Sequence, residues 1–199
     1  MVRRTSEQEK NIKLIITGSS AKLLSKELAT SLRGRVHNIE LYPLSFKEYL
    51  EWKKTTYNIE TLPQSKKKYE IIEQLQTYLE NGGYPVITRG EIPQPQATMK
   101  TYLDAMIFRD IVERHQIKET KKLQVLIKFL FEATAKEYSY NKLTQKLKNI
   151  GLSTSKNTVI NYISYCEEAY LFFEHLKHEY SINKQLSANK KMYCIDNGL

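Results

Sequence analysis

Hydrophobic residues along the first part of the chain change their spacing twice, and each change predicts a different element. Residues 12–17 form a short apolar run, which is typical of a buried strand. Three leucines then recur at helical spacing over residues 24–32, and Gly34 suits the left-handed turn that ends a helix. Residues 35–41 alternate between polar and apolar. The order strand, helix, strand predicts a right-handed βαβ unit with parallel strands.

A single βαβ unit leaves part of its own sheet uncovered, because a parallel sheet is buried by helices on both faces. The sequence nearby predicts no further strands that could complete it. An uncovered sheet edge pairs readily with another chain. We therefore expect either self-association through this exposed edge or pairing with a missing half of the same α/β domain.

The middle of the chain reads as a series of helices separated by loops. Ser45 and Glu48 have the Ser-x-x-Glu spacing of a capping box, so a helix should begin there. Another helix is predicted over residues 66–80, and the Gly-Gly-Tyr-Pro sequence at 82–85 should break it. A third helix is expected over 97–115. The apolar stripe expected on the second of these helices consists of Tyr69, Ile72, Leu75 and Leu79.

Three more amphipathic helices are predicted in the last third of the chain. Ser139 can cap the second of them, and the Ser-Thr-Ser run at 153–155 can cap the third. Residues 171–180 and 191–196 then look like two strands joined by a polar turn. Three helices followed by a hairpin is the order of a winged helix-turn-helix, so this fold is predicted here.

Composition adds charge to this picture and removes some classes of protein. The 199 residues are 41% hydrophobic and contain no apolar run near the roughly 20 residues of a membrane span. The N-terminus lacks the apolar core of a secretory signal. We therefore expect a cytoplasmic protein without membrane contact. Cys166 and Cys194 are not in a metal-ligand spacing, so no metal site is predicted. The net charge of +9 favours nucleic acid, although a lysine-rich surface also serves solubility.

The predicted second and third helices of the winged helix carry a basic and polar outer face. Residues 136–161 contain five lysines and a single acid, Glu137. Lysines and the free N–H groups of a helix start can hold phosphates, and asparagine can contact adenine edges. Arginine, which most often reads guanine, is absent from this stretch, so backbone contact with double-stranded DNA is the main expectation. The residues predicted for DNA contact are Lys142, Lys146, Lys148, Ser155, Lys156, Asn157, Asn161, Lys190 and Lys191.

Six short motifs follow one another in an order that resembles a known family. Three lie near the N-terminus: Leu-Ile-Ile-Thr-Gly-Ser-Ser at 14–20, Leu-Arg-Gly-Arg at 32–35 and Leu-Tyr-Pro-Leu-Ser-Phe-Lys-Glu-Tyr at 41–49. Three follow: Gly-Gly-Tyr-Pro at 82–85, Arg-Asp-Ile-Val-Glu-Arg at 109–114 and Lys-Met-Tyr-Cys-Ile-Asp-Asn-Gly-Leu at 191–199. Together they resemble the part that follows the Walker B strand in AAA-type ATPases with a C-terminal DUF4143 region.

This resemblance implies an ATPase domain, a helical lid, a winged helix and a nuclease-like fold in the full-length family, with ATP and Mg²⁺ as cofactors. It further implies that Thr17 and Ser19 lie near the terminal phosphate as sensors. Arg35 would sense phosphate in cis or from a neighbouring subunit. The alternatives from general structure are a helix cap for Thr17 and Ser19 and a solvated charge or ion pair for Arg35.

The catalytic centre of such an ATPase is not found in the sequence. There is no Gly-x-x-x-x-Gly-Lys-Ser/Thr run to wrap phosphates, and no acidic pair ends a strand to hold magnesium. The family's Walker segments would precede Ile12, and its nuclease-type carboxylates would follow Leu199. We therefore expect a fragment, either a natural truncation or a cut piece, that binds no cofactor and is inactive alone. ATPase activity would require a separate chain to supply the P-loop.

These inferences together predict an α+β, mostly helical fold in three parts. Residues 1–54 are expected to be the C-terminal remnant of the ATPase α/β domain, with the truncated βαβ unit of a P-loop sheet. Residues 55–119 are expected to form a helical lid, and residues 120–196 the winged helix-turn-helix that runs into the DUF4143 region. The leading hypothesis is an ATPase fragment whose winged helix binds DNA. The alternative is a protein–protein interaction module without nucleic-acid contact.

Overall fold

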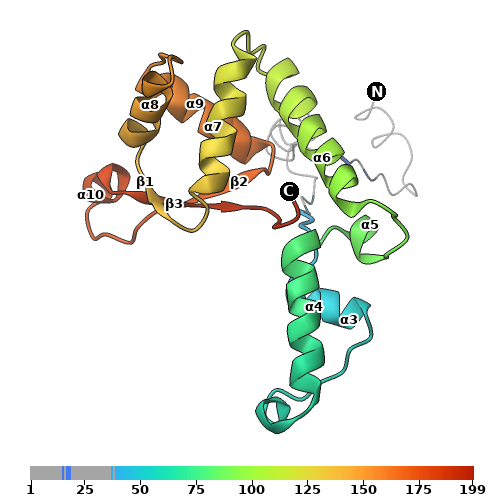
Figure 1. Ribbon diagram of the computed structural model, residues 1–199. Coiled ribbons are helices and arrows are strands. Elements are labelled where there is room, and N and C mark those ends of the chain that lie inside the picture. The colour runs from blue at the N-terminus through green and yellow to red at the C-terminus, as the bar shows by residue number, and fades with distance from the viewer. Residues whose placement is uncertain (1–14, 16, 19–36, 38) are drawn as a thin grey trace, which may run out of the picture.

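The computed structural model describes residues 15, 17–18, 37 and 39–199 (Figure 1). Most of the predicted βαβ unit, including Ser19 and Arg35, lies outside the described residues. The described end of its second strand, residues 39–41, runs as irregular chain. The remainder is α+β and mostly helical, as the sequence predicts, with a helical arm that projects from a larger body.

The arm consists of α3 (Phe46–Trp52), the short 3₁₀ helix η1 (Leu62–Gln64) and α4 (Lys67–Asn81). The predicted capping box at the start of α3 is confirmed, because Ser45 Oγ accepts the N–H of Glu48 at 3.3 Å and the Glu48 carboxylate accepts the N–H of Ser45 at 2.8 Å. These two bonds satisfy N–H groups that the first turn of a helix leaves unpaired.

The helices α3 and α4 of the arm pack against each other and enclose a small core. Its buried residues are Tyr49, Leu50 and Ile71. The stripe predicted for α4 is wrong in most of its members, because Tyr69, Ile72 and Leu79 are exposed. Helix α3 therefore covers a face of α4 that is rotated by about one residue from the predicted one.

After the arm the chain turns back towards the body through α5 (Pro85–Thr88) and α6 (Pro95–Ala105). Helix α6 continues directly into η2 (Met106–Glu113), which has π-helical hydrogen bonding. The predicted helix over 97–115 is thus present, but its second half is wound more widely than an α-helix. Wider turns of this kind are frequent at functional sites.

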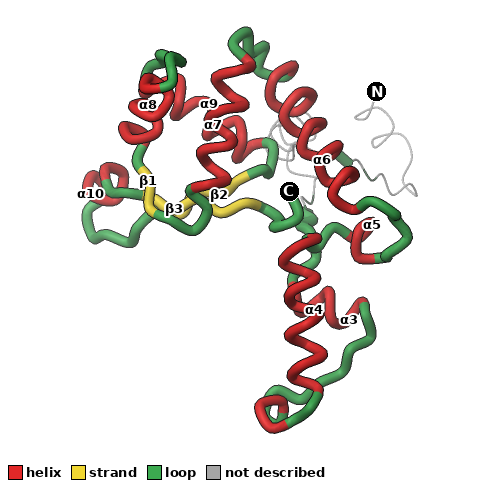
Figure 2. Tube along the Cα trace, in the orientation of Figure 1, coloured by secondary structure: helices red, strands yellow, loops and turns green. Residues whose placement is uncertain are grey.

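The body is built from three longer helices, one short helix and a small sheet (Figure 2). In chain order the elements are α7 (Thr120–Glu132), β1 (Glu137–Tyr138), α8 (Tyr140–Asn149), α9 (Lys156–Glu168), β2 (Phe172–His175), α10 (Ile182–Ser187) and β3 (Lys190–Cys194). The strand order is β1–β3–β2, and both pairings are antiparallel. Ser139 Oγ and Ser155 Oγ accept first-turn N–H groups at the starts of α8 and α9, which confirms both predicted caps.

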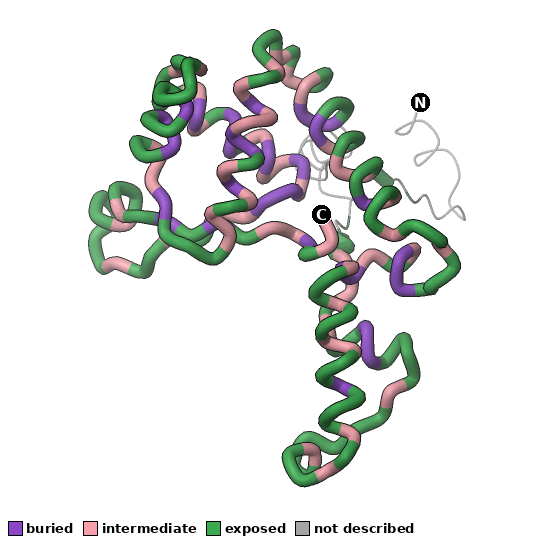
Figure 3. Tube along the Cα trace, viewed as in Figure 1, coloured by how far each residue is buried: buried purple, intermediate pink, exposed green. Residues whose placement is uncertain are grey.

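One continuous core holds the body together (Figure 3). The helix α7 contributes Leu123, Leu126 and Leu130, and all three are fully buried. They meet Phe172 and Met192 of the sheet, which are fully buried as well. Burying one such large side chain contributes about 1.5–3 kcal/mol, so this core dominates the stability of the body.

The predicted hairpin differs in detail from the observed one. β2 ends at His175 instead of continuing to residue 180, and the expected polar turn contains the short helix α10. β1 was not predicted, because two residues are too few to show an alternating pattern. Among the helices that the structure describes, none combines the length and the apolar character that crossing a bilayer requires.

Candidate functional site

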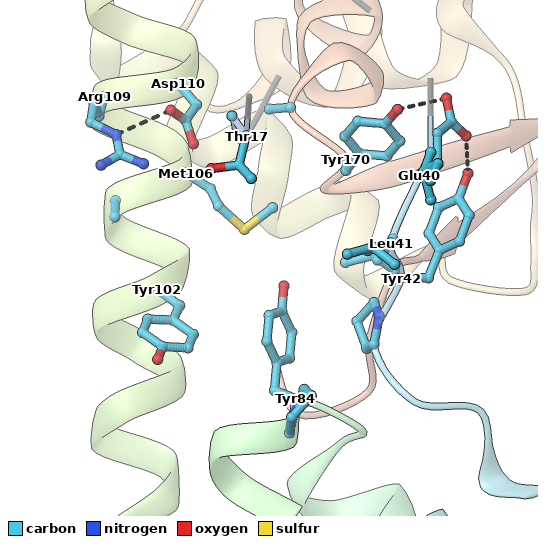
Figure 4. A pocket seen from close by; sticks show the side chains of 17 residues that line it. Thr17, Glu40, Leu41, Tyr42, Tyr84, Tyr102, Met106, Arg109, Asp110 and Tyr170 are labelled. Carbon is cyan, nitrogen blue, oxygen red and sulfur yellow. Dashed lines mark hydrogen bonds and ion pairs between the residues drawn. The ribbon is translucent and has the colours of Figure 1, made fainter. Parts of the chain in front are cut away.

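A cavity of about 550 Å³ lies between the chain segment before α3 and the helices α6 and η2 (Figure 4). Its wall is contributed by parts of the chain that are far apart in sequence. The side chains labelled in the close-up are Thr17, Glu40, Leu41, Tyr42, Tyr84, Tyr102, Met106, Arg109, Asp110 and Tyr170. Motifs that the sequence analysis recognised separately, at 14–20, 82–85 and 109–114, therefore meet at one place.

One side of the cavity carries a cation beside a hydroxyl. Arg109 Nε donates to Asp110 Oδ1 at 3.2 Å, and the Arg109 side chain is 66% exposed while that of Asp110 is 6% exposed. Thr17, Met106 and Asp110 line this cavity together with Arg109 (Figure 4). The widened turns of η2 set Arg109 and Asp110 on this wall. A guanidinium and a hydroxyl that line the same cavity suit an anionic group.

The opposite side is aromatic and acidic. The Glu40 carboxylate accepts hydrogen bonds from Tyr42 at 2.6 Å and from Tyr170 at 2.8 Å. Burial, followed by this contact with Glu40, raises the pKa of Tyr170 to about 12. Between the two sides the rings of Tyr84 and Tyr102 lie 5.7 Å apart. Burial, and after it the charge of Asp196, raises the pKa of Tyr84 to about 12, so this phenol stays protonated at neutral pH.

Three chain segments contact one another next to Tyr84, and we call this contact the glycine joint. The segments contain Leu44, residues 82–83 and residues 196–198. Asp196 Oδ2 accepts the N–H of Gly83 at 2.7 Å, and Asp196 Oδ1 accepts that of Gly198 at 2.8 Å. The N–H of Leu44 donates to Gly83 O at 2.8 Å. A Cβ atom on Gly82 would lie 1.7 Å from Asp196 Oδ1, and one on Gly83 would lie 2.1 Å from Leu44 O. Only glycine fits at these contacts, which explains the Gly-Gly sequence.

The structure describes one of the three residues that were expected to sense nucleotide. Thr17 is exposed on the wall of the cavity, whereas Ser19 and Arg35 lie outside the described residues. Sequence reasoning missed Arg109 and Tyr84 as neighbours of Thr17, since they are separated from it by more than sixty residues. The sequence contained one indication that both residues matter, because Tyr84 lies in the motif at 82–85 and Arg109 lies in the motif at 109–114.

Most of the residues predicted to contact DNA lie on the surface of the body. On α8 the side chains of Lys142, Lys146 and Lys148 are exposed. Lys146 Nζ lies 3.8 Å from the Glu132 carboxylate and 5.0 Å from the Phe129 ring centre. An exposed pair of this kind contributes little energy, so Lys146 can exchange Glu132 for another anion. The further exposed members of the predicted set are Ser155, Lys156, Asn157 and Asn161 on α9 and Lys191 on β3.

Lys190 does not fit the expectation of a solvent-facing wing lysine. It is 6% exposed, and its ammonium donates to Leu186 O at 2.9 Å and to Ala188 O at 3.3 Å. The same ammonium lies 4.6 Å from the ring centre of Tyr140. Because these contacts occupy Lys190 within the fold, we leave it out of the DNA-contacting surface.

A half-buried carboxylate that the sequence did not reveal, that of Glu174, fixes the start of α8. Tyr138 and Tyr140 both donate their hydroxyl hydrogen to Glu174 Oε1 of β2, the latter at 2.7 Å. Burial first, and then these bonds to Glu174, raise the pKa of both tyrosines above the ordinary value. The network ties α8 to the sheet and so fixes the orientation of the helix that carries Lys142, Lys146 and Lys148.

The described residues thus form a mostly helical body with a small antiparallel sheet and an adjoining cavity. Two family models match the chain. One, described as a domain of unknown function, DUF8612, covers residues 72–199, and the other, described as an AAA domain, covers residues 1–50. The chain belongs to the DUF8612 family, and its N-terminal match suggests an AAA-like ATPase. The C-terminal region is thus DUF8612, where the motifs had suggested DUF4143.

Two curated relatives match nearly the whole of this chain, and each is described as an uncharacterized protein. An uncharacterized protein of Methanocaldococcus jannaschii is 38% identical over 196 residues, covering 98% of this chain and 43% of that protein. An uncharacterized protein of Haemophilus influenzae is 32% identical over 189 residues, covering 95% of this chain and 45% of that protein. The chain therefore spans less than half the length of these relatives. No solved structure matches.

Proposed function

We propose that this chain is part of an AAA-type ATPase and that its residues 120–196 form a winged helix-turn-helix that binds double-stranded DNA. The order helix, strand, helix, helix, strand, helix, strand supports the winged helix, with the short α10 lying in the connection between the last two strands. So does the antiparallel strand order β1–β3–β2, with the first strand inserted between the first two helices. Residues 1–54 would be the ATPase remnant and residues 55–119 the lid in this division.

The exposed basic face of α8 and α9 is the observation that carries the proposal. Lys142, Lys146 and Lys148 project from α8, and Lys156 stands in the first turn of α9. Each lysine that replaces a counterion at a DNA phosphate adds affinity that falls with salt. The N-terminus of α9 adds the partial positive charge of the helix dipole at the same surface.

Contact with phosphates, more than with bases, is what this surface favours. The chain contains no arginine after Arg114, so the side chain that most often reads guanine is missing from α8 and α9. Asn157 and Asn161 are exposed on α9 and could contact adenine, one turn apart. We expect tight binding at low salt with modest preference among sequences.

Fluorescence anisotropy with a random-sequence duplex tests the proposal. The double variant Lys146→Ala with Lys156→Ala removes two of the proposed phosphate contacts. It should weaken binding and reduce the slope of log affinity against log salt by about 2. The matched control replaces two exposed lysines outside the body, Lys66 and Lys100, and should leave the slope unchanged. An unaltered slope in the first variant would exclude this face as the DNA surface.

A nucleotide-sensing role for Thr17, Ser19 and Arg35 is a second proposal, supported by the cavity. The Thr17 hydroxyl lines it together with the guanidinium of Arg109, and this pair fits a terminal phosphate. ATP with Mg²⁺ should then raise the thermal stability of the chain, and Thr17→Val should reduce that increase. Equal increases for both proteins, or none for either, would contradict a sensing role in this chain.

Exposed apolar side chains favour the alternative function, a protein-interaction module without nucleic-acid contact. Tyr69 is 70% exposed, and Ile72 and Leu79 are each 50% exposed along α4. Exposed patches of this kind often mark protein contacts. A chain that is monomeric by light scattering at high concentration, and that binds duplex DNA, would reject this alternative in favour of DNA binding.

A further inference from the structure

The connection between β2 and β3 presents an apolar tip to solvent. Tyr180 is fully exposed at 102% of its reference area, and its ring contacts His178 edge to face at 5.8 Å. Ile182 and Leu186, one turn apart on α10, are 72% and 58% exposed. These three side chains are not part of the body core, although that core buries other tyrosine, isoleucine and leucine side chains. A large apolar tip that the core leaves outside is a candidate contact surface.

This tip is held beside the proposed DNA face. The Lys190 ammonium donates to the carbonyl oxygens of Leu186 and Ala188 and also lies over the ring of Tyr140, the first residue of α8. Asn189 donates to the Glu137 carboxylate on β1 at 3.3 Å. Figure 1 accordingly shows α10 on the same side of the body as α8. The apolar tip and the lysines of α8 therefore form neighbouring parts of one surface.

The charge around the tip is complementary to a nucleic acid. Lys177 and Lys184 are exposed in this connection, and Lys191 is exposed at the start of β3. The acid Glu179 is paired with Lys177 at 2.9 Å, which leaves an excess of positive charge. A lipid surface would also attract lysines, but helices that lie on membranes bury a long apolar face, whereas α10 has six residues and two large apolar side chains. The combination therefore favours nucleic acid.

An exposed aromatic ring among lysines matches one particular form of nucleic acid. Within a duplex the base faces are stacked on one another, and only the base edges are accessible in the grooves. An aromatic side chain stacks readily on an unpaired base, whereas inside a duplex it would first have to unstack a base step at a cost in free energy. We propose that Tyr180 is a stacking site for an unpaired base, so that the preferred ligand is a junction between duplex and single-stranded DNA. This inference rests on the proposed binding of duplex DNA by α8 and α9.

Anisotropy binding to two labelled DNAs tests the proposal. One is a blunt duplex, and the other is the same duplex with a single-stranded tail of about ten nucleotides. The unmodified chain should bind the tailed DNA more tightly. Tyr180→Ala should weaken binding to the tailed DNA about five- to a hundredfold and leave binding to the blunt duplex unchanged. Tyr180→Phe keeps the ring and should retain the preference, while Tyr69→Ala, an exposed tyrosine on the arm, should have no effect.

The outcomes separate this inference from the function on which it rests. Equal affinity of the unmodified chain for both DNAs, or a preference that survives in Tyr180→Ala, overturns the stacking site while duplex binding stands. Absence of binding to either DNA overturns the DNA-binding function and the stacking site with it. Binding to phosphatidylserine vesicles that requires Tyr180, without a preference for tailed DNA, assigns the tip to a membrane surface and overturns the proposal.

Discussion

The arm and the body of this protein each enclose an apolar core, but the core of the arm is much smaller than that of the body. The arm buries Tyr49, Leu50 and Ile71 between its helices, whereas the body buries a continuous cluster from η2, α7, α8, α9 and the sheet. Stabilisation by burial is roughly proportional to the apolar area removed from water. The body therefore has a core able to support its own fold, and the arm depends on its attachment.

That attachment is the glycine joint. The Tyr78 hydroxyl at the end of α4 donates to Leu44 O at 2.7 Å, and Leu44 in turn donates to Gly83 O. Asp196 then connects Gly83 to the end of β3. These hydrogen bonds have a defined geometry, whereas the arm's apolar core is small and contributes less to its position. Hydrogen bonds therefore set the position of the arm, whereas hydrophobic burial sets the shape of the body.

The largest expected effect lies in the body core. Phe172 is fully buried against the ring of Phe131, with ring centres 4.8 Å apart. Phe172→Ala should lower the free energy of unfolding by about 3–5 kcal/mol, because it removes a large side chain and leaves a cavity. Urea unfolding followed by circular dichroism measures this. Ile72→Ala, at an exposed site on α4, is the control and should change stability by less than about 0.5 kcal/mol.

If Phe172→Ala costs no more than the control, the contrast between the two regions fails. The body would then be as adaptable as the arm, and its core could not be what fixes the orientation of α8 and α9.

The next effect concerns the joint. Asp196→Asn keeps the size of the side chain, but its amide group cannot accept both the Gly83 and the Gly198 N–H. One buried N–H is left unpaired, which should cost about 1–3 kcal/mol. Hydrogen exchange should show faster exchange of the Gly83 amide, with the amides of α7 unchanged. Asp104→Asn, at an exposed site on α6, is the control. Uniformly faster exchange in both regions would show that the joint supports the body as well.

A smaller effect is expected within the arm. Ser45→Ala removes the cap of α3 and should cost about 1 kcal/mol, since a first-turn N–H loses its acceptor. The loss should be confined to the amides of α3, measured by hydrogen exchange. Ser45→Thr retains a hydroxyl and should restore most of the protection. Protection in Ser45→Ala equal to the unmodified chain would mean that the arm does not depend on its capping box.

Local features of the fold could be predicted from the sequence, because the residues that cause them are adjacent. Ser45, Ser139 and Ser155 cap helices through N–H groups three residues away, and all three caps are present. The sequence also gives the order of helices in the body. The face of α4 that is buried was mispredicted, since Tyr69, Ile72 and Leu79 have helical spacing whether or not a partner helix covers them.

The features that define the candidate site depend on contacts between distant residues. Gly83 and Asp196 are 113 positions apart, and neither one alone indicates the other. Lys190 looks like an ordinary surface lysine until the carbonyl groups of α10 surround it, and α10 itself was expected to be a turn. The π-helical winding of η2 also has no signature in the spacing of its apolar residues. Such features follow from tertiary packing, which overrides local preference.

The smallest effect is a pH dependence that distinguishes the joint from ordinary surface carboxylates. Burial raises the pKa of Asp196 above its ordinary value of 3.8, and the N–H groups of Gly83 and Gly198 offset only part of this. A raised pKa means that the folded chain holds the proton longer than the unfolded chain does. The stability that this carboxyl contributes is therefore fully present below the unfolded pKa and is lost as pH rises through the folded pKa. Asp196→Asn does not titrate, so the cost of this substitution should be larger near pH 3 than near pH 7, as measured by urea unfolding of both proteins at each pH. A cost that instead grows with pH would mean that the two N–H groups outweigh burial, and that the joint is held by a carboxylate ion at neutral pH.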